Sequence, residues 1–420
     1  MNNDEGAIMN SQATQHDNRQ EPEQPHKYSF FIFQYTLVNL CRLAVSATFV
    51  FSGLVKLIDP VGTQYKIEDY AAALDMSALA AAPIPLVLAV VLALVEFCLG
   101  IYLFFGIRRR LTTTTILLFM LVYTPLTLWL AATDAVADCG CFGDALKLTN
   151  WQTFWKNVAL LAAAAIVFWR GNFLTRFISE STQWLISLFS LAYGLFLALL
   201  CIYAEPVMDF RPYHIGQHIP TAMQWPDDPE QLPEILDFEI DGNVSVDELV
   251  ADTSYSFLLV APYLETADDS NLEDINALYD YALHHNYRFI CLTASDENAI
   301  RRWQDLTGAE YDFAFVDELT LKTMARNNPA LLLIHNGTIV GKWSHHLLPQ
   351  KSSLTAPLHA LPFAHPQPAS YRRMLLRLLL WYLLPLLAIT LIDRAFASFR
   401  WWRRQRQKKA AQVPAESENA

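Results

Sequence analysis

Charged residues are scarce in this chain. Only 17% of its 420 residues are Asp, Glu, Lys or Arg, whereas 53% are hydrophobic, and the mean hydropathy is positive. Soluble domains carry about 25% charged residues, so this composition excludes an ordinary soluble protein and predicts an integral membrane protein. Positive charge is also in the minority. The formal net charge of −12 argues against nucleic acid as a partner.

A cleavable secretory signal is also missing from the start of the chain. The first 26 residues are polar and slightly acidic, without a basic start followed by an apolar run. We expect residues 1–26 to form a disordered cytoplasmic tail.

Long apolar runs are what the chain has instead. Most of them reach the roughly 20 residues that a bilayer crossing needs, and the fourth is the shortest. The six predicted spans are Tyr28–Phe51, Pro83–Phe105, Thr112–Ala132, Phe154–Trp169, Trp184–Tyr203 and Met374–Phe396.

Basic residues in the short connections predict the orientation. They follow the second, fourth and sixth spans, and the positive-inside rule places all three groups in the cytoplasm. Both termini are then cytoplasmic, residues 52–82, 133–153 and 205–372 lie outside, and we expect a multi-pass protein of the inner membrane. The basic residues are Arg108, Arg109, Arg110, Arg170, Arg176, Arg400, Arg403, Arg404, Arg406, Lys408 and Lys409.

These patterns divide the chain into segments. Spans one to four form a bundle and a fifth span follows it, after which a large polar segment precedes the last span. The predicted segments are a tail at 1–26, a four-span bundle at 28–175, a fifth span at 184–204, a Pro-rich linker at 205–250, a soluble domain at 251–350, a sixth span at 374–396 and a basic cytoplasmic tail at 397–420.

The soluble domain alternates strand and helix patterns. Short apolar runs predict strands at 255–260, 288–293 and 311–316, and helical periodicity predicts helices at 270–286, 296–307 and 318–327. Two further strands flank Asn336-Gly337, a strong hairpin signal. An α/β sandwich closed by an antiparallel hairpin follows from this order.

This order, with Pro329 just before the hairpin, resembles the thioredoxin fold, and residues 328–343 resemble its C-terminal half. The resemblance implies that Pro329 is a cis proline bordering an active site. The family's paired cysteines would follow the first strand, where this chain has Ala-Pro-Tyr-Leu-Glu-Thr at 261–266. Without a thiol this position cannot attack a disulfide, so we expect the extracytoplasmic domain to serve in binding, docking or shielding.

Two cysteines one residue apart, Cys139 and Cys141, stand between the third and fourth spans in the run Asp138-Cys-Gly-Cys-Phe-Gly-Asp144. Three interpretations stay open: a redox pair, two metal ligands or an incidental turn. Exposed vicinal cysteines outside the cytoplasm are ordinarily oxidised, which favours the redox pair. The loop has no His to complete a metal site, so we expect no metal there. Its carboxylates disfavour a thiolate.

The other cysteines are expected to be less reactive. Cys41, Cys98 and Cys291 lie in apolar runs and are interpreted as small buried hydrophobes. Cys201 lies near the outer end of the fifth span, where it is either a third partner in thiol exchange or simple packing.

Ionisable residues are few in the spans, which gives little support to a transporter. Arg42 and Glu96 are predicted to pair across spans one and two, with proton or quinone chemistry, or exposure of one of them at the interface, as alternatives. Lys56 and Asp59 stand at the outer end of span one. There Lys56 either favours a thiolate at the cysteine loop, or the two residues anchor the helix end.

Residues 35–175 resemble the DoxX-like family, especially its methylamine-utilisation MauE branch. The resemblance rests on Arg42-Leu-Ala, on 51–60 (Phe-Ser-Gly-Leu-Val-Lys-Leu-Ile-Asp-Pro), on Glu96 with Gly100, and on Cys-Gly-Cys-Phe-Gly at 139–143. MauE-like proteins are implicated in forming disulfides in exported partner proteins. The layout of the whole chain also resembles DoxX-type membrane proteins of Bacteroidetes.

Together these observations predict a helical polytopic membrane protein with a thioredoxin-like outer domain. Cys139 and Cys141 would handle thiol and disulfide redox for an exported protein partner, with Cys201, Lys56, Arg42 and Glu96 as auxiliary residues. No cofactor is evident, and a quinone is the electron acceptor we consider. The alternative is a non-enzymatic membrane scaffold whose cysteine pair is static, so the sequence leaves open whether the protein is an enzyme.

Overall fold

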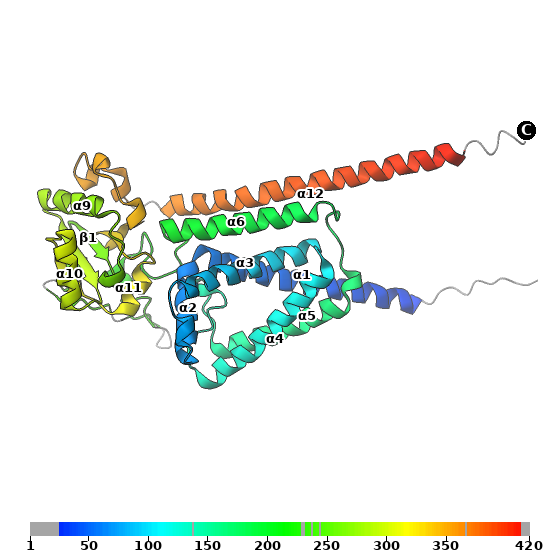
Figure 1. Cartoon of the computed structure of the whole chain (residues 1–420), viewed down its shortest axis with the longest axis horizontal. Coiled ribbons are helices and arrows are strands. Elements are labelled where there is room, and N and C mark those ends of the chain that lie inside the picture. The colour runs from blue at the N-terminus through cyan, green and yellow to red at the C-terminus, as the bar shows by residue number, and fades with distance from the viewer. Residues whose placement is uncertain are drawn as a thin grey trace, which may run out of the picture.

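The computed structural model describes residues 25–136, 138–227, 232–236, 238–242, 245–365 and 368–412 (Figure 1). Most of the tail expected at 1–26, and the end of the chain after Gln412, lie outside the described residues. A bundle of long helices adjoins a smaller domain built on a sheet, and the last helix runs back along the bundle (Figure 1).

Six of the described helices are long and apolar enough to cross a membrane. Five of them contain a predicted span, and α3 contains the second span except for Pro83, which precedes the helix. The bundle also holds α2, a shorter helix that packs mainly against α3 at the end of the bundle nearer the sheet (Figure 1). These helices are α1 (Pro25–Ile58), α2 (Pro60–Ala73), α3 (Ile84–Phe105), α4 (Arg109–Thr133), α5 (Asn150–Trp169), α6 (Gln183–Ala204) and α12 (Pro368–Gln412).

Two glycines set the register between the antiparallel helices α1 and α3. A Cβ on Gly53 would lie 2.4 Å from the backbone nitrogen of Phe97, and a Cβ on Gly100 would lie 2.7 Å from that of Val50. Only glycine permits backbones to approach this closely. The region around Ser52 and Lys56 is therefore brought beside Glu96.

The first described turns of α1 and the end of α12 both lie at the end of the bundle far from the sheet (Figure 1). The basic connections meet there too, since Arg109 of the α3–α4 connection donates to the carbonyl of Leu174 in the α5–α6 connection at 2.7 Å. The structure thus separates a basic end of the bundle from the end that carries the sheet domain, which we name the outer domain after the side of the membrane predicted for it.

The outer domain has a five-stranded mixed sheet in the order β3-β2-β1-β4-β5. The strands β1, β2 and β3 are parallel, and β4 and β5 are antiparallel to their neighbours. The elements are α7 (Ile219–Ala222), α8 (Val246–Ala251), β1 (Tyr255–Val260), α9 (Leu272–His284), β2 (Arg288–Thr293), α10 (Glu297–Thr307), β3 (Asp312–Phe315), α11 (Glu318–Met324), β4 (Ala330–His335) and β5 (Thr338–Ser344), with short 3-10 turns η4 (Leu264–Thr266) and η5 (His345–Leu347).

Every strand and helix predicted for this domain is present. The hairpin turn at Asn336 and Gly337 has positive φ at both residues, as the favoured two-residue hairpin turn requires. Asp296 caps α10 by accepting from the Ala299 amide. The peptide bond before Pro329 is cis.

The segment 205–250, interpreted from the sequence as a linker, is instead part of the outer domain. Its Ile219 and Leu249 belong to the core on one face of the sheet. It also covers both sheet edges, since Gly216 bonds to Ile339 of β5 and Asp241 bonds to Phe315 of β3. The physical reason is that an open sheet edge leaves backbone donors and acceptors unpaired, so a neighbouring segment covers it. The prolines of this segment, on which the linker interpretation rested, do not indicate such a pairing.

Candidate site at the disulfide loop

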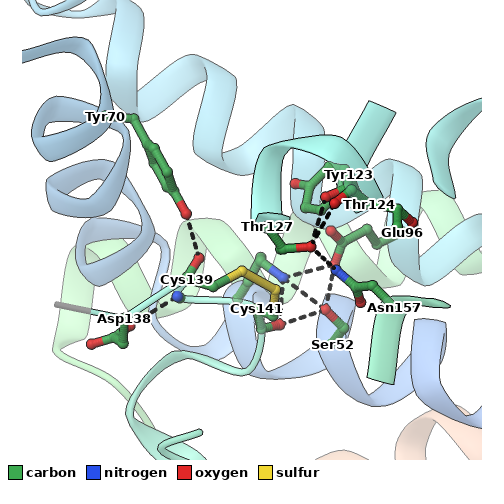
Figure 2. The surroundings of a disulfide bond; sticks show 12 residues. Ser52, Tyr70, Glu96, Tyr123, Thr124, Thr127, Asp138, Cys139, Cys141 and Asn157 are labelled. Atoms are coloured by element: carbon green, nitrogen blue, oxygen red, sulfur yellow. Dashed lines mark hydrogen bonds and ion pairs between the residues drawn. A yellow bond between two sulfur atoms is a disulfide. The ribbon is translucent and has the colours of Figure 1, made fainter. Parts of the chain in front are cut away.

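The cysteine loop joins α4 to α5 and lies against the outer ends of α1 and α2. Cys139 and Cys141 are joined in a disulfide. Cys139 is 9% exposed and packs with Leu130 and Val136, while Cys141 is half-buried. Figure 2 shows the disulfide held between polar side chains that approach it from two sides.

On one side, α2 holds the first half of the loop. The Tyr70 hydroxyl donates to the carbonyl of Cys139 at 3.1 Å (Figure 2). Lys66 pairs with Asp138 at 3.1 Å. Asp138 in turn accepts from the amide of Gly140 at 2.8 Å. Gly140 has φ +64°, a conformation that favours glycine between the two cysteines.

On the other side, α1 and α3 supply a buried charged network. The ammonium of Lys56 donates to Glu96 Oε2 at 2.8 Å, to Ser52 Oγ at 2.7 Å and to the carbonyl of Cys141 at 2.8 Å. Ser52 also donates to that carbonyl at 2.6 Å. Lys56 and Glu96 are each 4% exposed at the side chain. A membrane-buried ion pair therefore contacts the backbone of the disulfide.

The predicted Arg42–Glu96 pair is wrong. Arg42 lies in the middle of α1, beside the C-terminal end of α3, where it donates to the carbonyls of Leu103, Phe104 and Thr175. It therefore satisfies carbonyls left open at the end of α3. The reason is register: α1 continues to Ile58, past the predicted end of the span, so Lys56 rather than Arg42 lies at the depth of Glu96.

A small pocket opens beside Cys141 between α1, α3, α4 and α5. Its polar lining includes Glu96, Tyr123, Lys156 and Asn157, and the rest is largely apolar. Lys156 lies over the ring of Phe142, with its nitrogen 4.1 Å from the ring centroid. Sequence reasoning missed Tyr123, Lys156 and Asn157, because each sits singly in an apolar helix with no local motif.

The remaining cysteines lie away from this site. Cys201 is buried in a separate core formed by α1, α3, α6 and α12, which does not include the disulfide. Cys98 belongs to that same core, Cys291 is buried in β2, and Cys41 is half-buried on α1. The structure thus does not bring Cys201 to the disulfide loop.

Asp59 connects the site to the outer domain. It pairs with Arg326 at 2.7 Å, and Arg326 also pairs with Asp144 of the cysteine loop at 3.0 Å. Burial alone would raise the pKa of Asp59, but the neighbouring Arg326 lowers it below its usual range. Arg326 stands just before the cis proline Pro329, so the outer domain meets the bundle along that edge.

Residues 34–170 match the model of the methylamine utilisation protein MauE family. The membrane bundle is MauE-like. The match covers about a third of the chain, including α1 to α5 and the disulfide loop, and leaves out the outer domain. The chain matches no curated protein and no solved structure. With the six spans, the match supports a multi-pass membrane protein that lives in a lipid bilayer.

Proposed function

We propose that this MauE-like protein is a membrane thiol–disulfide oxidoreductase that acts in the maturation of exported proteins. The observation that carries the proposal is the contact of Lys56 with the carbonyl of Cys141. It joins the backbone of Cys141 to the buried Lys56–Glu96 pair, and ionisable residues within a membrane-spanning bundle are typical of functional sites.

The proposed step is a thiol–disulfide exchange. A thiolate of the partner attacks one sulfur of the Cys139–Cys141 disulfide, and the S–S bond breaks as a mixed disulfide forms. The partner's second thiol then attacks the mixed disulfide. The partner leaves with a new disulfide, and the two cysteines hold its two electrons and two protons as a dithiol.

Reoxidation needs an acceptor of two electrons and two protons, and a membrane quinone has that chemistry. The dithiol would return to the disulfide as the quinone becomes a quinol. The quinone is proposed on this redox chemistry alone, because the pocket beside Cys141 has a volume of only about 30 Å³, which is room for about one water molecule.

We propose that the outer domain is a degenerate thioredoxin-like module that docks on the bundle. The neighbour order β2-β1-β4-β5 and the antiparallel hairpin support that fold. Tyr263 and Leu264 occupy the turn after β1 where the resemblance expects thiols. Asn328, next to Pro329, donates to the Tyr263 carbonyl, so that turn and the proline lie together beside Arg326.

The orientation we propose follows the basic end of the bundle. Both termini would be cytoplasmic, and residues 205–372 with the disulfide loop would lie in the periplasm of a cell with an inner membrane.

The test is a redox titration of the full-length protein in isolated membranes. Alkylation shift against a dithiothreitol or glutathione series should reveal a reversible midpoint that vanishes in Cys139→Ser and Cys141→Ser and is unchanged in Cys41→Ser. A pair that is never reduced short of denaturation would refute an exchange function.

The alternative of a static scaffold has one observation in its favour, the burial of Cys139. In that case the double serine variant would lose thermal stability, and the maturation of exported disulfide proteins would stay at the wild-type level.

A further inference from the structure

We propose that Asp268, His345 and His346 bind a divalent transition-metal ion of the zinc class. One ligand atom from each of the three residues lies within 4.8 Å of the other two. Asp268 follows η4, whereas the two histidines begin η5 directly after β5. The site lies in the outer domain and is independent of the cysteine pair, so it goes beyond the proposed function.

The orientation of His345 is the strongest evidence. Its Nδ1 lies 3.0 Å from the carbonyl of Pro329, a contact that requires the proton on Nδ1 and leaves the lone pair on Nε2. That Nε2 is buried in a residue only 6% exposed and makes no hydrogen bond within the described residues, and it faces the Asp268 carboxylate, whose Oδ2 lies 3.4 Å away. Metal-binding histidines almost always donate their second ring nitrogen to a carbonyl or carboxylate in this way.

The three ligands are held in place before any ion binds. The amide of Asp268 donates to the carbonyl of Asn328 at 2.9 Å, and the amide of His345 donates to the carbonyl of Pro329 at 3.3 Å. Both ligand segments thus attach to the same dipeptide. The ring of His346 stacks on Tyr203 at the end of α6, with centroids 4.4 Å apart and planes 5° apart.

The donor set fits the metal. Two imidazole nitrogens and one carboxylate oxygen suit zinc, and in a tetrahedral site with bonds of about 2.0–2.1 Å adjacent ligand atoms lie about 3.3 Å apart. Asp268 Oδ2 already lies 3.4 Å from His345 Nε2. The Asp268 carboxylate is exposed, which gives an ion a path in. Three protein ligands leave one position open for water or for a donor from a bound molecule.

The experiment uses the full-length protein in detergent, purified through a tag without histidine and stripped with a chelator. Zn²⁺ is titrated in competition with a chromophoric chelator, and Co²⁺ is added separately to record its visible spectrum. The variants are Asp268→Asn, His345→Ala and His346→Ala. The matched control is His284→Ala, because His284 and His285 form a second adjacent histidine pair at the end of α9.

The expected result is one Zn²⁺ per chain, with affinity lowered by about 100-fold in His345→Ala or His346→Ala, since even outer-shell changes cost 10–100-fold. The His284→Ala protein should bind as the wild type does. Equal Zn²⁺ affinity in the wild type and all three ligand variants would overturn the proposal. If His345→Ala does not fold, the proposal is decided by His346→Ala, whose native side chain is only half-buried, and by the Co²⁺ spectrum of the wild type. A wild-type spectrum without tetrahedral cobalt bands also rules the site out.

Discussion

At the scale of single residues, the membrane bundle depends on charged side chains that are buried away from water. Lys56 and Glu96 pair inside the bundle, and Arg42 is buried against helix-end carbonyls. A charge in the membrane is costly unless it is paired or hydrogen-bonded. Each of these residues has its partners, and removing one residue should destabilise the protein because its partner is left buried and unpaired.

Lys56→Met should be strongly destabilising, because it leaves Glu96 buried without its cation. Breaking a buried pair costs about 3–5 kcal/mol, measurable as a loss of thermal stability in detergent. The double variant Lys56→Met/Glu96→Leu should regain much of it, because no lone charge remains. Lys147→Met, at an exposed position of the α4–α5 connection, is the control. A single variant as stable as this control would contradict the network.

In the outer domain, Asp209 should make stability depend on pH. Burial alone would raise the pKa of Asp209, but Lys342 and Arg211, each 2.7 Å from it, lower it far below its usual range. A lowered folded-state pKa contributes stability above the unfolded-state pKa of about 3.9. That stability is lost as pH falls through the folded-state value.

The melting temperature of the outer domain should therefore fall below about pH 4, and Asp209→Asn should flatten that dependence while lowering stability at neutral pH. The exposed Asp305→Asn should keep the wild-type slope. An unchanged slope in Asp209→Asn would show that other carboxylates carry the effect.

At the scale of elements, turns and contacts decide how helices and strands meet. Glycines let α1 and α3 touch, and Arg326 fastens the outer domain to the bundle through Asp59 and Asp144. The glycine of the β4–β5 turn and the Arg326 contact can each be tested with a matched pair of variants.

Gly337→Ala should cost more stability than Gly308→Ala. Both glycines have positive φ, so each alanine should cost about 1–2 kcal/mol from the backbone. A Cβ on Gly337 would also lie 3.0 Å from Pro220 Cδ and from the carbonyl of Val250, whereas one on Gly308 meets nothing within 4 Å. Chemical denaturation of the full chain, followed by tryptophan fluorescence, measures the difference. Equal losses of stability in the two variants would mean that Pro220 and Val250 move aside for the added Cβ at no cost in free energy.

Arg326→Gln should loosen the outer domain from the bundle. Hydrogen bonds to charged groups are worth about 1.5–3 kcal/mol, so amide exchange in α2 should become at least about tenfold faster. Hydrogen–deuterium exchange of the full-length protein measures this, with Arg301→Gln, an exposed residue of α10, as the control. Exchange in α2 that is unchanged relative to that control would place the docking contact elsewhere.

At the scale of the whole molecule, the separation of the basic end from the outer domain predicts the topology. An impermeant maleimide should label Ser352→Cys in intact cells, and Gln405→Cys only after the membrane is opened. Both positions are exposed. The reverse labelling pattern would show that the protein has the opposite orientation, with the disulfide loop in the cytoplasm.

The sequence by itself determined the six long apolar helices, the strands and helices of residues 251–350 and the cysteine loop, because hydropathy and periodicity are properties of neighbouring residues. It did not predict α2, α7 or α8. The strands at 255–260 and 288–293 and the Asn336-Gly337 turn were predicted as they occur. Only the tertiary structure decided the partners. Lys56 faces Glu96 because glycines set the α1–α3 register, and Asp268 meets His345 because both attach to Asn328 and Pro329. Such pairings depend on how distant segments pack, which a local pattern does not encode.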